Sequence, residues 1–274
     1  MELNTPNGML FYEETGSAQP LILLHGNGED HHIFDTAVPL LANQFRVIAV
    51  DSRGHGQSFP VSEYHYRDMA EDIRLLINAL GLEKPLICGF SDGGILALLL
   101  AVQYPELLGG IIACGVNTRP QGLKKRWLLA FRIMYLFDRS PLFRLMLTEP
   151  DITSEQLGKI RCPVLITGGS RDMISRRHLQ EIAARIPGAQ LQILPGEGHG
   201  GAGGPAARIL PVREGRLAHR VGAVLKGRAA VAGGEGPREG EALDGAERGD
   251  DDRRPDGEDV ADGVADVEAV LMHG

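Results

Sequence analysis

The sequence predicts an α/β fold, with a mostly parallel central sheet, helices on both of its faces and a small helical cap. Short, continuous apolar runs such as "LILL" at 21–24 and "VIAV" at 47–50 have the length of strands, and their lack of alternation is typical of strands that are covered on both faces. Helical patterns lie between the runs, and this alternation predicts crossover connections. Residues 117–160 interrupt the alternation, and residues 201–274 differ from the rest in composition.

The length and charge of the chain limit what it can be. Its 274 residues suffice for one α/β domain with a sizeable core. A formal net charge of −8, without any basic block, argues against nucleic acid as the main partner. No apolar run approaches the roughly 18 residues of a membrane span, and the N-terminal residues show no secretory leader. The odd number of cysteines, 3, at the ends of apolar runs predicts reduced thiols and a cytoplasmic location.

Strands and helices can be placed along residues 1–200, which we predict to form one domain. A helix is expected at 68–80, where the apolar residues share one stripe and Gly81 ends the pattern. Two further helices are expected at 92–103 and between Arg176 and Pro187. The expected strands are 9–13, 21–24, 47–50, 85–88, 108–114, 163–167 and 189–194.

The insertion at 117–160 is predicted to form the cap over the sheet edge. The stretch "LKKRWLLAFRIMYLF" is a helix candidate with Trp127, Phe131 and Tyr135 at intervals of four residues. Thr153 and Gln156 have the spacing of a capping box that opens another helix. We expect Trp127 and Phe131 to line an acyl pocket; the alternative is that they only join cap to core. The basic start of the stretch suggests contact with a membrane surface as a minor alternative.

Residues 201–274 contain no Ser, Thr, Asn, Gln, Cys, Phe, Tyr or Trp. Nearly every residue type that remains is encoded by codons starting with G or C. A functional domain rarely loses so many residue types together, so we interpret this tail as a shifted-frame or otherwise non-native reading of GC-rich coding sequence. Such a tail would bury little surface and be largely disordered. The alternative is a genuine disordered tail.

The stretch "CGFSDGG" places Ser91 between an expected strand and an expected helix. It matches G-x-S-x-G in the strand–turn–helix context that a nucleophile elbow requires. Glycines at 89 and 93 are expected because larger side chains would collide in so tight a turn. The motif alone is a weak signal, and an ordinary Ser/Gly turn is the alternative.

A serine nucleophile needs a base, and the base needs an orienting carboxylate. Asp172 in "GGSRD" and His199 in "GEGHG" each follow an expected strand, so both should lie at the same sheet edge as Ser91. We therefore predict a Ser91–His199–Asp172 triad. Two alternatives are that Asp172 caps a helix and that Glu197 is the acid.

The turn "HGNG" at 25–28 follows another expected strand. Its backbone can direct an N–H at a developing oxyanion. We assign the two donors to the amides of Asn27 and Asp92. His25 is expected to brace this loop, and His55 in "DSRGHGQS" is expected to be structural.

The sequence also holds adjacent histidines in "EDHHIF". Asp30, His31 and His32 could suggest a metal site, but neighbouring histidines at a helix start are usually solvated, so we expect no metal.

In order and spacing, "HGNG", "DSRGHGQS", "GFSDGG", "GGSRD" and "GHG" resemble the α/β-hydrolase fold superfamily over residues 1–199. The "SDGG" elbow is similar to that of biphenyl-hydrolase-like esterases. The resemblance implies a serine hydrolase that acts on small esters or related acyl compounds without a cofactor.

Residue by residue, the resemblance gives Ser91 the role of nucleophile, Asp172 that of acid and His199 that of base. The amides of Asn27 and Asp92 would form the oxyanion hole. A sharper hypothesis is that the carboxylate of Asp92 receives a substrate ammonium. The alternative is that an acid is favoured near a helix N-terminus and that only its amide matters.

Two features depart from the family pattern. The cap is short, and "GHG" runs directly into the anomalous tail where the family has a final helix against the sheet. Because that helix would help to position His199, activity of this chain is a separate question from its ancestry. Other chemistry on this fold (C–C hydrolase, lactonase or perhydrolase), a non-catalytic binding module and an inactive product are the alternatives.

Overall fold

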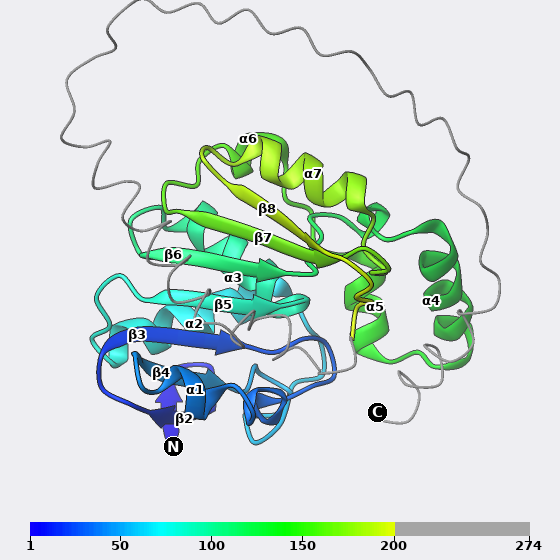
Figure 1. Cartoon of the computed structure of the whole chain (residues 1–274). Coiled ribbons are helices and arrows are strands. Elements are labelled where there is room, and N and C mark those ends of the chain that lie inside the picture. Colours follow the sequence, from blue (N-terminus) through cyan, green and yellow to red (C-terminus); the bar gives the residue numbers. More distant parts are fainter. Residues whose placement is uncertain (201–274) are drawn as a thin grey trace, which may run out of the picture. The chain divides into compact units, whose positions relative to one another are not determined.

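The computed structural model describes residues 1–200. The predicted tail, 201–274, and any helix that follows His199 lie outside the described residues. In the described part, strands form one eight-stranded sheet in the order β1-β2-β4-β3-β5-β6-β7-β8 (Figure 1). The strands are β1 Glu2–Thr5, β2 Gly8–Thr15, β3 Gln19–Leu24, β4 Phe45–Val50, β5 Leu86–Phe90, β6 Gly110–Cys114, β7 Val164–Gly169 and β8 Gln190–Leu194.

The sheet is mostly parallel, as predicted. Strands β4, β3, β5, β6, β7 and β8 pair in parallel, and only the β1–β2 and β2–β4 pairs are antiparallel. Strand β1 was not predicted, because "ELNT" is short, polar and half-exposed. It forms a hairpin with β2, so its pairing rather than its own sequence pattern makes it a strand.

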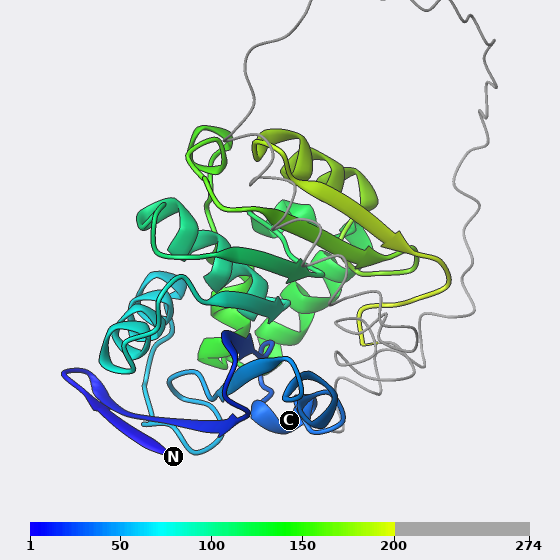
Figure 2. The ribbon, with the colours of Figure 1, turned by 60° about the vertical axis from the view of Figure 1, so that its left-hand side comes forward.

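Helices cover both faces of the sheet, which confirms the predicted fold class. Figure 2 shows α2 and α3 on one side and α1 on the other. The first face of the sheet is covered by α2 Tyr66–Ala79, α3 Asp92–Gln103 and α7 Arg176–Arg185. The second face is covered by the 3-10 helix η1 His31–Phe34 and by α1 Val38–Leu41.

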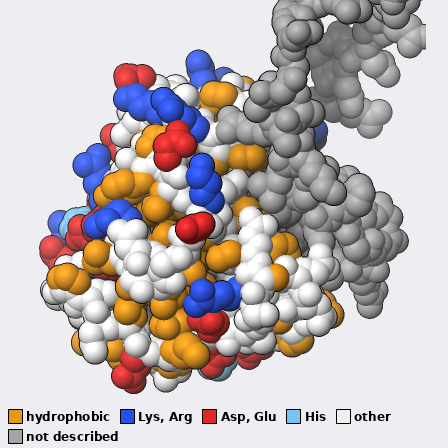
Figure 3. Space-filling view, turned by 90° about the vertical axis from the view of Figure 1, so that its left-hand side faces the viewer, with side chains coloured by type: hydrophobic (Ala, Val, Ile, Leu, Met, Phe, Trp, Pro, Cys, Tyr) orange, Lys and Arg blue, Asp and Glu red, His pale blue; other side chains and the backbone are white. Residues whose placement is uncertain are grey.

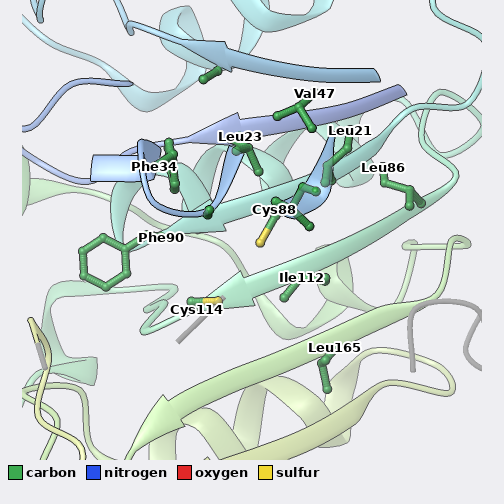
Figure 4. Close-up of a cluster of buried hydrophobic side chains, with 13 residues drawn as sticks. Leu21, Leu23, Phe34, Val47, Leu86, Cys88, Phe90, Ile112, Cys114 and Leu165 are labelled. Atoms are coloured by element: carbon green, nitrogen blue, oxygen red, sulfur yellow. The ribbon is translucent and has the colours of Figure 1, made fainter. Parts of the chain in front are cut away.

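A cluster of buried side chains lies between the sheet and η1–α1 (Figure 4). Alternate residues of the strands point to this face, as the two-residue period of a strand requires. Phe34 from η1 is fully buried against Leu23 of β3 and Val47 of β4 in this cluster. The cluster fixes the carboxyl end of β3, from which the loop starting at His25 emerges.

Of the helices between β6 and β7, α4 and α5 lie at the carboxyl ends of the strands, whereas α6 lies beside α7 (Figure 1). The helix predicted in "LKKRWLLAFRIMYLF" is confirmed as α4, and so is the capping box: Thr153 Oγ1 accepts from Gln156 N–H at 3.2 Å. Whether residues 117–160 behave as a separate cap on a domain of residues 1–200 stays a prediction. Here the insertion holds η2 Pro120–Gly122, α4 Lys125–Phe137, α5 Pro141–Thr148 and α6 Ser154–Leu157.

The opposite end of the sheet, at the amino ends of the strands, carries interspersed charges of both signs (Figure 3). Glu106 pairs there with Lys84 at 3.8 Å and with Arg161 at 3.1 Å. An open hollow of about 330 Å³ is lined by these three residues. Because Glu106 pairs with both cations, we assign no chemistry to this hollow. None of the helices in residues 1–200 has the length and apolar character to cross a membrane.

Phe34→Ala tests the packing of η1. Phe34 is 0% exposed, so we expect the substitution to lower the free energy of unfolding by about 3–5 kcal/mol. Leu40→Ala in α1 is the matched control, because Leu40 is 51% exposed and should change stability by less than about 0.5 kcal/mol. Urea unfolding measures both, and equal losses would contradict the burial described here.

Candidate active site

The turn between β5 and α3 puts Ser91 in a conformation that few residues adopt. Its φ is 50° and its ψ is −113°, and its backbone N–H donates to the carbonyl of Cys114 at 2.8 Å. A Cβ atom at Gly89 would collide with the backbone of Gly93, and one at Gly93 would collide with the carbonyl of Leu24. The glycines predicted on either side of the serine are therefore required by close backbone approach.

Ser91, His199 and Asp172 are brought together at the carboxyl ends of β5, β7 and β8. His199 Nε2 lies 3.0 Å from Ser91 Oγ, and His199 Nδ1 lies 2.7 Å from Asp172 Oδ1. If Nδ1 carries the proton and donates to Asp172, Nε2 is left to accept the hydroxyl proton of Ser91. The arrangement can thus increase the nucleophilicity of the hydroxyl.

Asp172 is held rigidly in this position. It is fully buried, and its carboxylate also accepts from Ile174 N–H at 3.0 Å. The alternative that Asp172 caps a helix is wrong, because Ser175 is the N-cap of α7. Glu197 accepts from Arg171 N–H through its backbone carbonyl.

The amides of Asn27 and Asp92 have the freedom that oxyanion donors need. Within residues 1–200, neither backbone N–H has a hydrogen-bond acceptor. Asp92 opens α3, where first-turn N–H groups lack partners in the helix. The loop of Asn27 is fixed on both sides: Gly28 N–H donates to His55 Nε2 at 3.2 Å, and the carbonyl of His25 accepts from Gly93 N–H at 3.0 Å.

His25 and His55 make bracing contacts of the kind expected from the sequence. His25 Nε2 accepts from Ser52 N–H at 3.0 Å, so its Nδ1–H is the group that donates to the carbonyl of Gly26. Burial, helped by the nearby His55, lowers the pKa of His25 to about 4. A neutral imidazole thus joins the 25–28 loop to the loop after β4.

Sequence reasoning missed two residues of the site, Tyr66 and Glu29. Tyr66 Oη donates to Asp92 Oδ1 at 2.8 Å, and burial followed by the charge of Asp92 raises its pKa. Glu29 Oε2 accepts from Gly26 N–H at 2.8 Å, and burial raises its pKa. No motif marked either one; Glu29 directly follows "HGNG", which was its only signal.

The carboxylate of Asp92 faces the interior of the protein. It is 4% exposed, and its two oxygens accept from Tyr66 Oη and, at 3.0 Å, from Asn27 Nδ2. Burial raises its pKa, against the effect of these two donors. Because the carboxylate contacts donors of the chain itself, these contacts favour a structural role over contact with a substrate ammonium.

Trp127 and Phe131 are buried in the cap. Their ring centroids lie 6.1 Å apart, and Phe131 lies 6.3 Å from Phe143 of α5. These contacts join α4 to α5. The indole N–H of Trp127 is buried without an acceptor in residues 1–200, which is unusual for a buried tryptophan.

Asp30, His31 and His32 have ligand atoms within 4.8 Å of one another. His31 Nδ1 already contacts Asp51 Oδ1 at 2.8 Å, and His32 Nδ1 contacts Asp35 Oδ2 at 3.2 Å. These contacts engage one ring nitrogen of each histidine. The expectation that both histidines are solvated is wrong for His31, which is buried, and holds for His32, which is exposed.

A serine, a histidine and an aspartate arranged in this way, at the carboxyl edge of a mostly parallel eight-stranded sheet, define an α/β hydrolase. The comparisons agree: residues 19–134 match the family described as alpha/beta hydrolase fold. The chain belongs to this family. It is 30% identical over 251 residues to RutD of Caulobacter sp. (strain K31), a proposed carbamate hydrolase, with 73% of this chain and 92% of RutD covered.

Solved structures give the same fold. A hydrolase from Pseudomonas aeruginosa PA01 is 26% identical with a TM-score of 0.61, over 82% of this chain and 97% of the other. A carboxylesterase structure from Nitrososphaera gargenis is 22% identical with a TM-score of 0.69, over 83% of this chain and all of the other. Hydrolysis is the general activity that these relatives support.

The neutral His25 should make stability depend on pH. Its pKa is about 4 in the folded chain, against 6.5 as the reference value. Between these values the unfolded chain binds the proton and the folded chain does not, so stability falls as the pH drops from 6.5 to 4. We expect His25→Gln to be less stable than the unaltered chain at pH 7, by a margin that shrinks by about 3 kcal/mol at pH 4.

Urea unfolding across this pH range measures the margin. His32→Gln is the comparison: His32 is exposed, and its contact with Asp35 raises its pKa, so the margin of this variant should change with pH in the opposite direction. A margin for His25→Gln that stays constant with pH would show that His25 has the same pKa in the folded and unfolded chains, and would contradict the prediction.

Proposed function

We propose that this chain is a cytoplasmic serine hydrolase that cleaves small carboxylic esters through an acyl-enzyme intermediate. The observation that carries the proposal is the pair of contacts that connects Ser91 Oγ, His199 and Asp172, with distances of 3.0 Å and 2.7 Å. These are hydrogen-bond distances in the order that nucleophilic catalysis requires.

The proposed reaction has two halves. Ser91 Oγ attacks the ester carbonyl carbon while His199 Nε2 takes the hydroxyl proton, and Asp172 stabilises the imidazolium that forms. The carbonyl oxygen becomes an oxyanion that receives the N–H groups of Asn27 and Asp92. His199 then gives its proton to the leaving alkoxide, and the C–O bond breaks to leave the acyl group on Ser91.

Water completes the cycle. His199 takes a proton from the water, whose oxygen attacks the acyl carbon, and the proton returns to Ser91 Oγ as the carboxylic acid leaves. Every proton in these steps is carried by a group of the chain or by water, so the mechanism requires no cofactor or metal.

The proposed substrate is a small acyl compound. The cap consists of short helices, and Trp127 and Phe131 would contribute apolar surface and one unpartnered indole N–H to substrate binding. RutD's name proposes a carbamate as its substrate, and the Nitrososphaera structure is titled a carboxylesterase. Esters, lactones and carbamates share the first addition step, so all three classes belong in a substrate panel.

Ser91→Ala is the decisive variant. We expect a fluorophosphonate probe to label the unaltered chain and not Ser91→Ala, and turnover of p-nitrophenyl acetate to fall by at least about a thousandfold. Asp172→Asn should fall by about the same factor, because the histidine is then held in the wrong tautomer. Ser62→Ala, at an exposed serine, is the matched control and should keep full labelling.

Two results would contradict the proposal. Equal labelling of the unaltered chain and Ser91→Ala would exclude Ser91 as the nucleophile. A chain that folds, binds acyl ligands equally well with and without Ser91→Ala and turns none over would be a binding module on a hydrolase scaffold. Circular dichroism establishes folding in either case.

A further inference from the structure

Three side chains form a hydrogen-bonded bridge beside Ser91, and the catalytic steps above use none of them. Asn27 Nδ2 donates to Asp92 Oδ2 at 3.0 Å, and Tyr66 Oη donates to Asp92 Oδ1 at 2.8 Å. Both carboxylate oxygens therefore have a donor. We call this set the Asn27–Asp92–Tyr66 bridge.

The bridge joins the same two residues that supply the oxyanion donors. Any residue except proline at position 92 would provide the backbone N–H, so the donor itself does not require a carboxylate. Burying a carboxylate is costly unless its oxygens are hydrogen-bonded, and burial does raise the pKa of Asp92. What the side chain adds is a direct contact with Asn27, whose own N–H is the other donor.

Tyr66 extends the bridge toward the cap. It is the first residue of α2, and its backbone N–H donates to Glu149 Oε2 at 3.0 Å. Glu149 is the C-cap of α5, and its other oxygen contacts His65 Nδ1 at 2.7 Å. Thus a series of hydrogen bonds connects the end of the cap helix α5, the start of α2 and the loop of Asn27.

We propose that Asp92 is a positioning residue: its carboxylate holds the loop of Asn27 so that both oxyanion donors converge, and Tyr66 holds the carboxylate. The proposal rests on the serine hydrolase function proposed above. In this proposal the side chain of Asp92 keeps the two oxyanion donors in place for the transition state, and it does not recognise the substrate.

Reversing the polarity of the bridge tests it. Asn27→Asp alone places two carboxylates in contact, whereas Asn27→Asp with Asp92→Asn restores one donor and one acceptor with their positions exchanged. We expect the single variant to lose about a hundredfold in kcat with KM little changed, since misplacement by about 1 Å has that effect. The double variant should recover to within about tenfold of the unaltered chain.

Two further measurements separate positioning from general damage. The affinity of a trifluoromethyl ketone, whose oxygen occupies the oxyanion hole, should fall and recover in parallel with kcat. Tyr66→Phe should show a smaller loss in the same direction. Asn78→Asp, at an exposed asparagine of α2, adds the same charge outside the bridge and should leave both quantities unchanged.

The proposal is overturned if the double variant is no better than Asn27→Asp, or if the loss appears in KM with kcat unchanged. Thermal unfolding of the same variants provides a second test, which is independent of activity: Asn27→Asp should lower Tm and the double variant should restore it. If Ser91→Ala hydrolyses esters as well as the unaltered chain, the proposed function fails, while the unfolding data still decide whether the bridge exists.

A second inference rests on the cap helix α4. Four large hydrophobic side chains on one stripe of this helix face solvent: Leu129 (58% exposed), Ile133 (48%), Leu136 (62%) and Phe137 (86%). We call these the outer stripe of α4. Their spacing is that of one helical face, and the buried Trp127 and Phe131 occupy another.

Cations border the outer stripe. Lys125, Arg126 and Arg132 of α4 are all exposed, in a chain whose formal net charge is −8. Two copies meeting through this stripe would bring like charges together, whereas an anionic lipid surface attracts the cations and receives the apolar side chains. We infer that the outer stripe of α4 binds anionic membrane surfaces.

Vesicle sedimentation tests this inference. The full chain should sediment with vesicles of equimolar phosphatidylglycerol and phosphatidylcholine, and not with phosphatidylcholine alone. Phe137→Glu should weaken binding by at least about tenfold, since it removes apolar insertion and adds repulsion. Leu40→Glu, at an exposed leucine of α1, is the control. No sedimentation with either vesicle, equal binding by Phe137→Glu, or a dimer that Phe137→Glu dissociates would each overturn the inference.

Discussion

The turn at Ser91 is the constraint on which the rest of the site depends. A positive φ for a non-glycine residue costs on the order of 1–3 kcal/mol and persists only where the surroundings impose it. Here the surroundings are three strands: Ser91 N–H is held by Cys114 at the end of β6, and Gly93 N–H is held by His25 after β3. The hydrogen bonds that hold the turn therefore depend on the pairing of β3, β5 and β6. The same contacts place His25, and with it the oxyanion loop, next to the nucleophile.

The residues that could be predicted from the sequence share one property: each lies within a few residues of the end of a parallel strand. Ser91, Asp172, His199 and the 25–28 turn all lie where parallel strands end, and parallel pairing brings such positions to one edge. Apolar patterning brings these positions to one edge, and the G-x-S-x-G motif and the family resemblance then give the residues their roles, without knowledge of any side-chain contact. Strand β1 shows the converse, because its polar residues pair through a hairpin and carry no pattern of their own.

Tyr66 and the orientation of Asp92 could not be predicted, because both depend on packing between distant segments. Tyr66 lies 26 residues before Asp92, and only the contact of α2 with α3 brings its hydroxyl to the carboxylate. The sequence left two interpretations of Asp92 open, substrate contact and structural support. Both interpretations place an acid after the nucleophile, and only the burial and the hydrogen bonds of the carboxylate favour one over the other. In the same way, Trp127 and Phe131 have helical spacing that suits a pocket or a core.

A carboxylate beside an oxyanion hole presents an electrostatic problem, since its charge opposes the charge that develops there. Three features reduce the problem for Asp92. Its two oxygens accept from Tyr66 and Asn27, it lies in the first turn of α3, where the helix dipole favours negative charge, and its oxygens are directed toward these donors. The electrostatic cost is thus lowered by the very contacts that fix the geometry, so positioning of the donors can outweigh the adverse charge.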